Sequence, residues 1–387
     1  MNTQSQPDLV VLSHLRWPWV WQRPQHLVSR FAEQRRQSGA QTWFVEEPIA
    51  GDVEQASIRS ERTDGITRVC LEVPGVNDPT GSISFTDPRA STYGTLLSEL
   101  LAEQGCAPAP DLWLYTPMAY DIARQLPGGR LVYDVMDDLS AFRYAPEGLR
   151  LRQRRLLSAA DIVFTGGRSL HRSMLNQRRD GVHLFPSGVE STHYAISRRL
   201  RASRTRKVAG YVGVIDERLD LAILEAMAAA LPDWSVQLVG PLAKIDEAAL
   251  PQADNIHYAG QVPYDSLPRV MAGFDVGLMP FALNEATRAI SPTKTLEYLA
   301  AGLPVVSTRI ADVVADYADI VHFADNGAEF AEACREVVTH RLSERDHRLR
   351  PIQARQEWDY IADSMADLLD EHGQTADYSS DDEGVSA

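Results

Sequence analysis

The stretch Ser291–Ser307, SPTKTLEYLAAGLPVVS, decides the fold because it reads as a capped helix that runs into a buried strand. Ser291 is a good N-cap, and Pro292 suits the first helical position. Gly302 ends the predicted helix, and the apolar residues after it predict a short strand. A helix that leads directly into a buried strand is typical of a parallel α/β sheet.

The start of this helix suits an anion. Thr293, Lys294 and Thr295 follow the cap, where free N–H groups and the helix dipole favour negative charge. Glu297 lies three residues after Lys294 and therefore on the same face. A cation for a diphosphate beside a carboxylate for sugar hydroxyls would suit a nucleotide-sugar. An ordinary Lys294–Glu297 surface pair would give the same pattern.

Length and composition narrow the class of protein. A chain of 387 residues is long enough for two domains, and 44% hydrophobic residues are ample for packed cores. A net charge of −15 argues against nucleic acid as a partner. Cys70, Cys106 and Cys334 are scattered without zinc-type spacing, which favours free thiols in a reducing compartment. No signal-peptide pattern or bilayer-length apolar run is present, so we expect a cytoplasmic protein.

Short apolar runs alternate with amphipathic helices along the chain, and this rhythm predicts two doubly wound parallel α/β halves. A polar, basic connection from Ser197 to Lys207 separates them. The predicted parts are an N-terminal Rossmann-like domain at 1–190, a C-terminal one at 191–350, a helix at 351–372 that crosses back to the first domain, and a disordered acidic tail at 373–387.

The second half offers several candidate ligand contacts at strand ends, where open parallel sheets bind ligands. Gly213 follows a predicted strand and allows close backbone approach, and Gly240 ends the next strand. Arg218 could offer planar donors to a diphosphate. Pairing of Arg218 with Asp216 or Asp220 is the alternative.

The first half has an unusual aromatic and basic loop, HLRWPWVWQRPQHL, from His14 to Leu27. Aromatic faces stack on sugar rings, whereas Arg and Gln bond to hydroxyls or phosphates. Some of these tryptophans would instead be core residues. The candidates for acceptor binding are Arg16, Trp17, Gln22, Arg23 and His26, and His14 is a candidate for shaping the catalytic site.

Two adjacent carboxylates, Asp137 and Asp138, follow another predicted strand of the first half. Like charges so close should raise at least one pKa, which suits a general base. The alternative is that one of them caps the following helix.

These segments together resemble GT-B glycosyltransferases of group 1, from about Asp8 to about Leu369. Ser291–Ser307 resembles the C-terminal signature of that family, and the Arg-Pro-Gln-His-Leu helix start resembles bacterial envelope-polysaccharide transferases of the teichuronic-acid type. The resemblance implies that Val262, in a strand-to-helix loop, lies against the nucleotide base. The family's Gly-Arg pair is Gly213-Val214 here, and Ala289 replaces a glutamate found in one branch.

The resemblance implies transfer of a sugar from a nucleoside-diphosphate sugar to a hydroxyl, in cell-envelope or extracellular polysaccharide or glycolipid synthesis. Arg218 and Lys294 would neutralise the leaving diphosphate, Glu297 would hold the ribose, and Asp137 or Asp138 would act on a saccharide or lipid-linked acceptor. No metal and no cofactor are expected. A nucleotide-sugar epimerase and a non-catalytic nucleotide-sugar-binding protein are the alternatives.

Charge distribution adds one further expectation about partners. The region from Arg143 to Lys207 is rich in arginine and poor in acid, although the whole chain is acidic. It would suit peripheral contact with anionic lipids at the inner face of the membrane. Solvated helix faces give the same composition.

Overall fold

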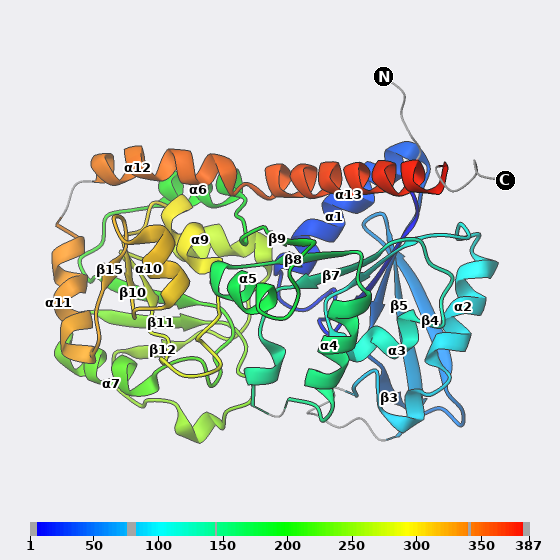
Figure 1. Ribbon diagram of the computed structural model, residues 1–387. Coiled ribbons are helices and arrows are strands. Elements are labelled where there is room, and N and C mark those ends of the chain that lie inside the picture. The colour runs from blue at the N-terminus through cyan, green and yellow to red at the C-terminus, as the bar shows by residue number, and fades with distance from the viewer. Residues whose placement is uncertain (1–5, 76–82, 144, 340–341, 382–387) are drawn as a thin grey trace. The chain divides into compact units, whose positions relative to one another are not determined.

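The computed structural model describes residues 6–75, 83–143, 145–339 and 342–381. Contacts divide the chain into two units, each a layered α/β structure (Figure 1). The first unit contains Met1–Asp134, Arg150–Phe164 and Trp358–Ala387, and the second contains Val135–Leu149 and Thr165–Glu357. The contact division thus gives residues 135–149 and 165–190 to the second unit, whereas the sequence predicted a boundary at residue 190.

The first unit is built on a mostly parallel sheet with strand order β3-β5-β2-β1-β6-β7-β8. β1 pairs in parallel with both β2 and β6, and its residues are fully buried because helices cover both faces. β4 adds an antiparallel strand to β5. The strands are β1 (Leu9–Ser13), β2 (Thr42–Glu46), β3 (Ile49–Gly51), β4 (Ser57–Thr63), β5 (Ile66–Pro74), β6 (Asp111–Leu114), β7 (Leu131–Val135) and β8 (Ile162–Thr165).

The helices of the first unit are α1 (Arg23–Ser38), α2 (Tyr93–Glu103), α3 (Tyr120–Ala123), α4 (Leu149–Ala159) and α13 (Trp358–Asp381). α1 and α13 pack together: the rings of His26 and Trp358 stack 4.9 Å apart, and Gln34 donates to Asp363 at 2.8 Å. Trp358 is therefore a core residue of this unit. The chain returns to the first unit immediately after Glu357.

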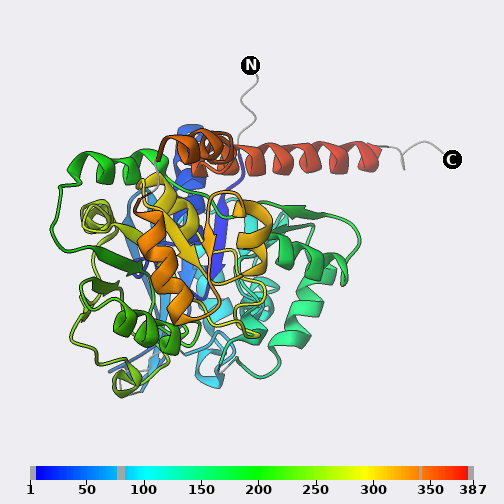
Figure 2. The ribbon, with the colours of Figure 1, turned by 90° about the vertical axis from the view of Figure 1, so that its left-hand side faces the viewer.

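The C-terminal helix is longer than the sequence predicted. α13 continues as one helix past Gly373 to Asp381 (Figure 2), where we expected a disordered tail. The last part of that predicted tail, residues 382–387, lies outside the described residues. The preceding helix, α12 (Leu342–Arg355), belongs to the second unit, so the predicted crossing helix at 351–372 is two helices that meet near residue 357.

The second unit has a parallel sheet with strand order β12-β11-β10-β13-β14-β15. The chain runs outward from β10 to β12, then returns to the other side of β10 and runs outward again. β10 and β13 therefore flank a topological switch point, where doubly wound sheets bind ligands. The strands are β10 (Val208–Val212), β11 (Ser235–Val239), β12 (Ile256–Tyr258), β13 (Val276–Met279), β14 (Val305–Ser307) and β15 (His322–Phe323).

Helices flank this second sheet (Figure 1). They are α7 (Leu221–Ala230), α8 (Leu267–Met271), α9 (Lys294–Ala300), α10 (Ala311–Tyr317) and α11 (Gly327–Val337). The same unit contains β9 (Val182–Leu184), α5 (Arg168–Leu175) and α6 (Ser191–Leu200). Among the described residues of the whole chain, no helix combines the length and apolarity needed to cross a membrane.

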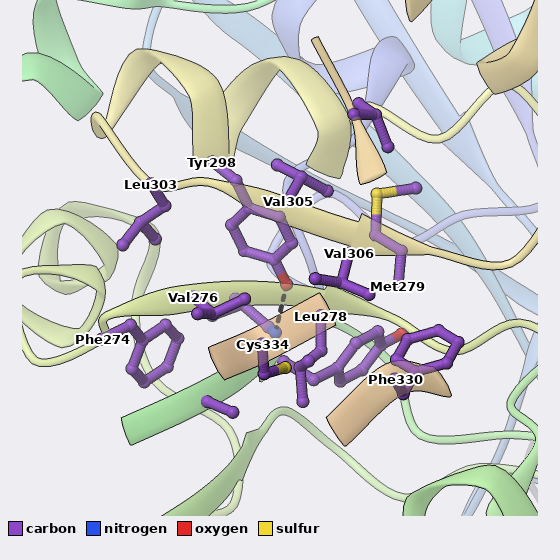
Figure 3. Packing of buried hydrophobic residues seen from close by; sticks show 14 of the residues in the cluster. Phe274, Val276, Leu278, Met279, Tyr298, Leu303, Val305, Val306, Phe330 and Cys334 are labelled. Atoms are coloured by element: carbon purple, nitrogen blue, oxygen red, sulfur yellow. Dashed lines mark hydrogen bonds between the residues drawn. The ribbon is translucent and has the colours of Figure 1, made fainter. Parts of the chain in front are cut away.

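The core of the second unit fixes α9 to the sheet through Tyr298 (Figure 3). Its ring is fully buried, and its hydroxyl accepts a hydrogen bond from the Val212 N–H at 2.7 Å. Gly277 leaves room for this ring, because a Cβ there would lie 2.6 Å from it. Val305 and Val306 of β14 pack beside it. The predicted sequence of helix, Gly302 turn and buried strand is therefore confirmed.

Candidate functional site

Glycines line the carboxyl end of the second sheet. Gly213 follows β10, Gly240 follows β11, and Gly260 lies beyond β12. The Gly240 N–H donates to the Gly260 carbonyl at 2.8 Å, and a Cβ on Gly240 would overlap the Gly213 carbonyl. Gly213 and Gly240 have φ values of +144° and +149°, which strongly favour glycine. Gly240 therefore packs the strand ends together, which is a simpler role than the predicted donor contact.

Gly213 makes room for Lys294, the first residue of α9. A Cβ on Gly213 would overlap Lys294 Cε, and Lys294 Nζ lies 5.8 Å from the centre of the Tyr211 ring. Burial lowers the pKa of Lys294, and the nearby Glu297 opposes that shift. The sequence predicted that Gly213 allows a ligand to approach. In this structure the close neighbour is instead the lysine predicted to bind that ligand.

Arg218 is held by Asp216 two residues earlier. Nε of Arg218 lies 2.9 and 3.0 Å from the two carboxylate oxygens, and Nη2 lies 2.7 Å from Oδ2. Asp216 is buried, so the pairing that the sequence left open as an alternative is present but not at the surface. Arg218 also lies with Cζ 5.7 Å from the centre of the Phe142 ring, in the loop after β7.

The loop after β7 brings Asp137 next to these cations. Burial raises the pKa of Asp137 to about 6, and the charges of Arg218, Lys294 and Lys244 oppose that rise. In the same loop, the ring of Phe142 lies 5.0 Å from Lys244 Nζ. Asp137 is therefore the carboxyl of the predicted pair that has the properties of a base near neutral pH.

Asp138 has a different environment. Its Oδ1 accepts a hydrogen bond from the Ser140 hydroxyl at 2.7 Å, and its Oδ2 lies 4.0 Å from Arg288 Nη2. It occupies the N-cap position of a short 3₁₀ helix, Leu139–Ala141, without a side-chain bond to that helix's backbone N–H groups. Asp138 thus supports the loop that carries Asp137.

Glu297 lies on α9 near Lys294, as predicted. Burial raises the pKa of Glu297, whereas Lys294, Thr293 and Tyr194 favour its ionised form. Tyr194 of α6 is itself buried, and its ring contacts Tyr264. Glu297 is therefore a half-buried carboxylate with polar neighbours, which suits a hydrogen-bonding role.

Several predicted donor contacts differ in the structure. The helix begins at Lys294, so Ser291 is not its N-cap and Thr293 occupies that position without a side-chain cap. Thr295 is fully buried, and its hydroxyl donates to Met279 Sδ at 3.3 Å. Its side chain therefore faces the core, and the predicted donor contact of Thr295 stays a prediction that its hydroxyl does not support. Val262 is half-buried against the hydrophobic core.

In the first unit, three predicted acceptor residues have structural roles. Trp17 is buried with its ring 5.1 Å from Phe44, and His26 is buried in the contact with α13 described above. Arg16 donates to the carbonyls of Glu47 and Pro48 at 2.6 and 2.9 Å. These side chains stabilise the loop after β1, so direct contact with an acceptor is not supported for them.

Arg23 is the clearest correction. Its side chain is 1% exposed, and Nε lies 2.9 and 3.0 Å from the two oxygens of Asp134, which is fully buried. Gln22 is half-buried at the start of α1, where it forms a capping box with Gln25. His14 is half-buried in the same loop, and its predicted catalytic role stays a prediction.

Sequence reasoning missed Phe142 and Lys244. Lys244 follows the Gly240-Pro241 turn and has φ +60°, an uncommon value for a residue other than glycine. A turn signal was visible in the sequence, but the contact of Lys244 with Phe142 joins segments about a hundred residues apart. Only the folded chain reveals that contact.

Comparison with known proteins finds similarity to glycosyltransferases. Residues 206–340 match the family described as glycosyl transferases group 1. The chain is 28% identical over 242 residues to the putative teichuronic acid biosynthesis glycosyltransferase TuaH of Bacillus subtilis strain 168. That similarity covers 58% of this chain and 59% of the relative, so only part of the relative's length is matched.

Solved structures show the same fold. Sucrose-phosphate synthase from Thermosynechococcus elongatus has a TM-score of 0.70 at 14% identity, over 96% of this chain and 100% of that one. Anabaena HepE, crystallised with UDP and glucose, has a TM-score of 0.66 at 14% identity, over 94% and 100%. The chain therefore has the GT-B fold, and its residues 206–340 are similar to the group 1 glycosyltransferase family.

Proposed function

We propose that this protein is a glycosyltransferase that moves a sugar from a nucleoside-diphosphate sugar to a hydroxyl acceptor. One observation carries the proposal: Lys294 and Arg218 lie with Asp137 at the switch point of a sheet that matches the group 1 family. Two cations suit a leaving diphosphate, and a carboxyl with a pKa of about 6 suits proton removal from a hydroxyl.

The proposed roles follow from the chemistry of each side chain. Lys294 and Arg218 stabilise the negative charge that develops on the leaving diphosphate. Glu297 accepts hydrogen bonds from the ribose hydroxyls. Asp137 orients the acceptor hydroxyl and takes its proton as the new glycosidic bond forms. HepE was crystallised with UDP, which supports a nucleoside-diphosphate donor here as well.

For the acceptor we propose a saccharide or lipid-linked saccharide of the cell envelope. The similarity to TuaH, a putative teichuronic acid biosynthesis glycosyltransferase, supports an envelope polysaccharide as the product. The many arginines of α4, at positions 150, 152, 154 and 155, suit peripheral contact with the anionic membrane face where such acceptors are found.

A second candidate, a non-catalytic nucleotide-sugar-binding protein, has one observation in its favour. Ala289 stands where one branch of the family has a glutamate, and it is only 9% exposed. A buried methyl group cannot hold a donor sugar by hydrogen bonds. The exposed Glu285 and Arg288 in the same loop are the polar side chains nearest to that position in the sequence.

The test uses the full chain with UDP-, GDP-, ADP- and dTDP-glucose, in the presence and absence of a membrane-lipid extract as acceptor source. We expect one donor to release its nucleoside diphosphate faster when the extract is present, and to add one hexose mass to a lipid or saccharide. Lys294→Ala should abolish this release. The matched control is Lys207→Ala, because Lys207 pairs with Asp275 at the opposite end of β10.

Two results would contradict the proposal. A new sugar nucleotide without diphosphate release would indicate an epimerase. Thermal stabilisation by a nucleoside diphosphate, with no turnover of any sugar nucleotide, would favour the binding protein. Ligand at a hundred times its Kd raises the free energy of unfolding by about 2.7 kcal/mol, so binding can be detected independently of turnover.

A further inference from the structure

The guanidinium of Arg218 is used asymmetrically. One edge, formed by Nε and Nη2, makes three contacts with the Asp216 carboxylate at 2.7 to 3.0 Å. The Arg218 backbone N–H donates to the same carboxylate at 3.0 Å. A carboxylate that bonds both the main chain and the side chain of one arginine fixes the orientation of that arginine.

The other edge of the guanidinium is available. Across the described ranges, Nη1 of Arg218 has no hydrogen-bond partner within the protein. The face of the group is covered by Phe142, with Cζ 5.7 Å from the ring centre. The Nε/Nη2 edge and one face of the guanidinium thus have neighbours, and the Nη1 edge carries two N–H donors.

We infer that Asp216 is a positioning residue: it holds Arg218 so that the Nη1 edge is presented to the diphosphate of the donor. The inference rests on the proposed function, because it names how that same site binds its substrate. An arginine side chain has large rotational freedom, and a ligand that orders it bears that entropy cost. Asp216 orders the Arg218 side chain when the protein folds, so the ligand meets a guanidinium that is already oriented.

A competing role for Asp216 would change diphosphate affinity in the opposite direction. If Asp216 merely competed with the diphosphate for Arg218, its removal would free the guanidinium and tighten binding. The burial of Asp216 argues against competition: its side chain is 8% exposed, compared with 25% for Arg218. Leaving Asp216 buried without its partner would cost free energy, so a ligand that displaced it would bind more weakly.

The chain contains a matched control with the same local geometry. Asp87 and Arg89 have the same spacing, and Asp87 accepts from the backbone N–H, Nε and Nη2 of Arg89, each at 2.9 Å. That pair lies in the first unit and is more exposed, at 23% and 45%. Asp87→Asn therefore removes the same type of turn without altering the proposed site.

The experiment measures Kd by calorimetry for the full-length wild type, Asp216→Asn, Asp87→Asn, Arg218→Lys and the double variant Asp216→Asn/Arg218→Lys. The probes are UDP, GDP, ADP and dTDP with the matching monophosphates. We expect Asp216→Asn to weaken diphosphate binding about tenfold, the size of one charged hydrogen bond. We expect monophosphate binding to weaken less, so the ratio of monophosphate Kd to diphosphate Kd should fall. A general loss of structure would weaken both ligands equally and leave that ratio unchanged.

The outcomes separate this inference from the proposed function. Wild-type binding with an unchanged or lower Kd in Asp216→Asn would overturn the inference alone. A loss as large in Asp87→Asn, or fully additive losses in the double variant, would also overturn it, because a positioning residue acts through its arginine. If the wild type bound none of the four diphosphates, the proposed function and this inference would fall together.

Discussion

Replacing Asp137 by asparagine should make the protein more stable and less active. The native pKa is about 6 and the ordinary value is 3.8. At pH 7 the carboxyl is ionised in both the folded and the unfolded chain, but ionisation is harder in the folded one. The native pKa lies about 2 above the ordinary one. The charge on Asp137 therefore lowers the free energy of unfolding by about 3 kcal/mol. Asn keeps the shape and lacks the charge.

The sign of this effect depends on pH. Below pH 3.8 Asp137 is protonated in both states and has no such effect. Between pH 3.8 and about 6 the unfolded chain ionises first, so the destabilisation grows, and above about pH 6 it stays constant. Asp137→Asn should therefore unfold at higher urea than the wild type at pH 7.5. The gain should almost vanish at pH 4.

Activity should change in the opposite direction. A base is active when it is deprotonated, so the wild-type kcat/KM, which reports the protein without ligand, should fall about tenfold per pH unit below pH 6. Asp137→Asn should lose at least a hundredfold in kcat, a typical contribution of general-base catalysis, and should lose this acidic limb. Asp138→Asn is the adjacent control, and we expect it to keep the limb.

Urea unfolding at both pH values, with kcat and kcat/KM measured from pH 4.5 to 8, checks both halves of the reasoning. A lower free energy of unfolding for Asp137→Asn at pH 7.5 would refute the electrostatic argument, because the charge would then be stabilising. A normal kcat in a stabilised variant would refute the catalytic role and leave the electrostatic argument standing.

Three further changes test other parts of the structure. Gly213→Ala should weaken binding of the donor diphosphate at least tenfold, measured by calorimetry, because its Cβ would displace Lys294 and the residue must adopt φ +144°. Arg23→Met should lower the free energy of unfolding by about 3 to 5 kcal/mol in urea titrations, because Asp134 would be left buried and unpaired. The double variant Arg23→Met/Asp134→Asn should recover part of the lost free energy of unfolding. Glu297→Ala should weaken binding of a ribonucleoside diphosphate more than binding of its 2′,3′-dideoxy form. An equal loss of affinity for both ligands would contradict contact with the ribose.

The sequence predicted well those features that depend on neighbouring residues. The helix-turn-strand unit from Lys294 to Ser307 was recognised from capping and periodicity, and both elements are present in the structure. Gly213 was recognised because a glycine after a strand indicates close approach. The helix start was predicted two residues early, since Ser291-Pro292 resembles a cap, whereas Thr293 occupies the N-cap position.

The differences between sequence and structure concern partners that are distant along the chain. Arg23 looked like a ligand contact because it stands in a polar, aromatic loop, yet its partner Asp134 is 111 residues away. Thr295 looked like part of a phosphate-binding turn, but the side of α9 that faces β13 is set by packing against Met279. Local patterns give the chemistry available to a segment, whereas tertiary contacts decide which of its side chains are already used.

The charges around Asp137 suggest how a donor could activate the acceptor. Three cations, Arg218, Lys244 and Lys294, lower the pKa of Asp137, and burial outweighs them so that it reaches about 6. A diphosphate bound to Lys294 and Arg218 would neutralise two of these cations and add negative charge of its own. Both changes raise the pKa of Asp137 further and make it a stronger base. In the proposed reaction the donor therefore increases the basicity of the group that deprotonates the acceptor, so proton removal is favoured only where a leaving diphosphate is already bound.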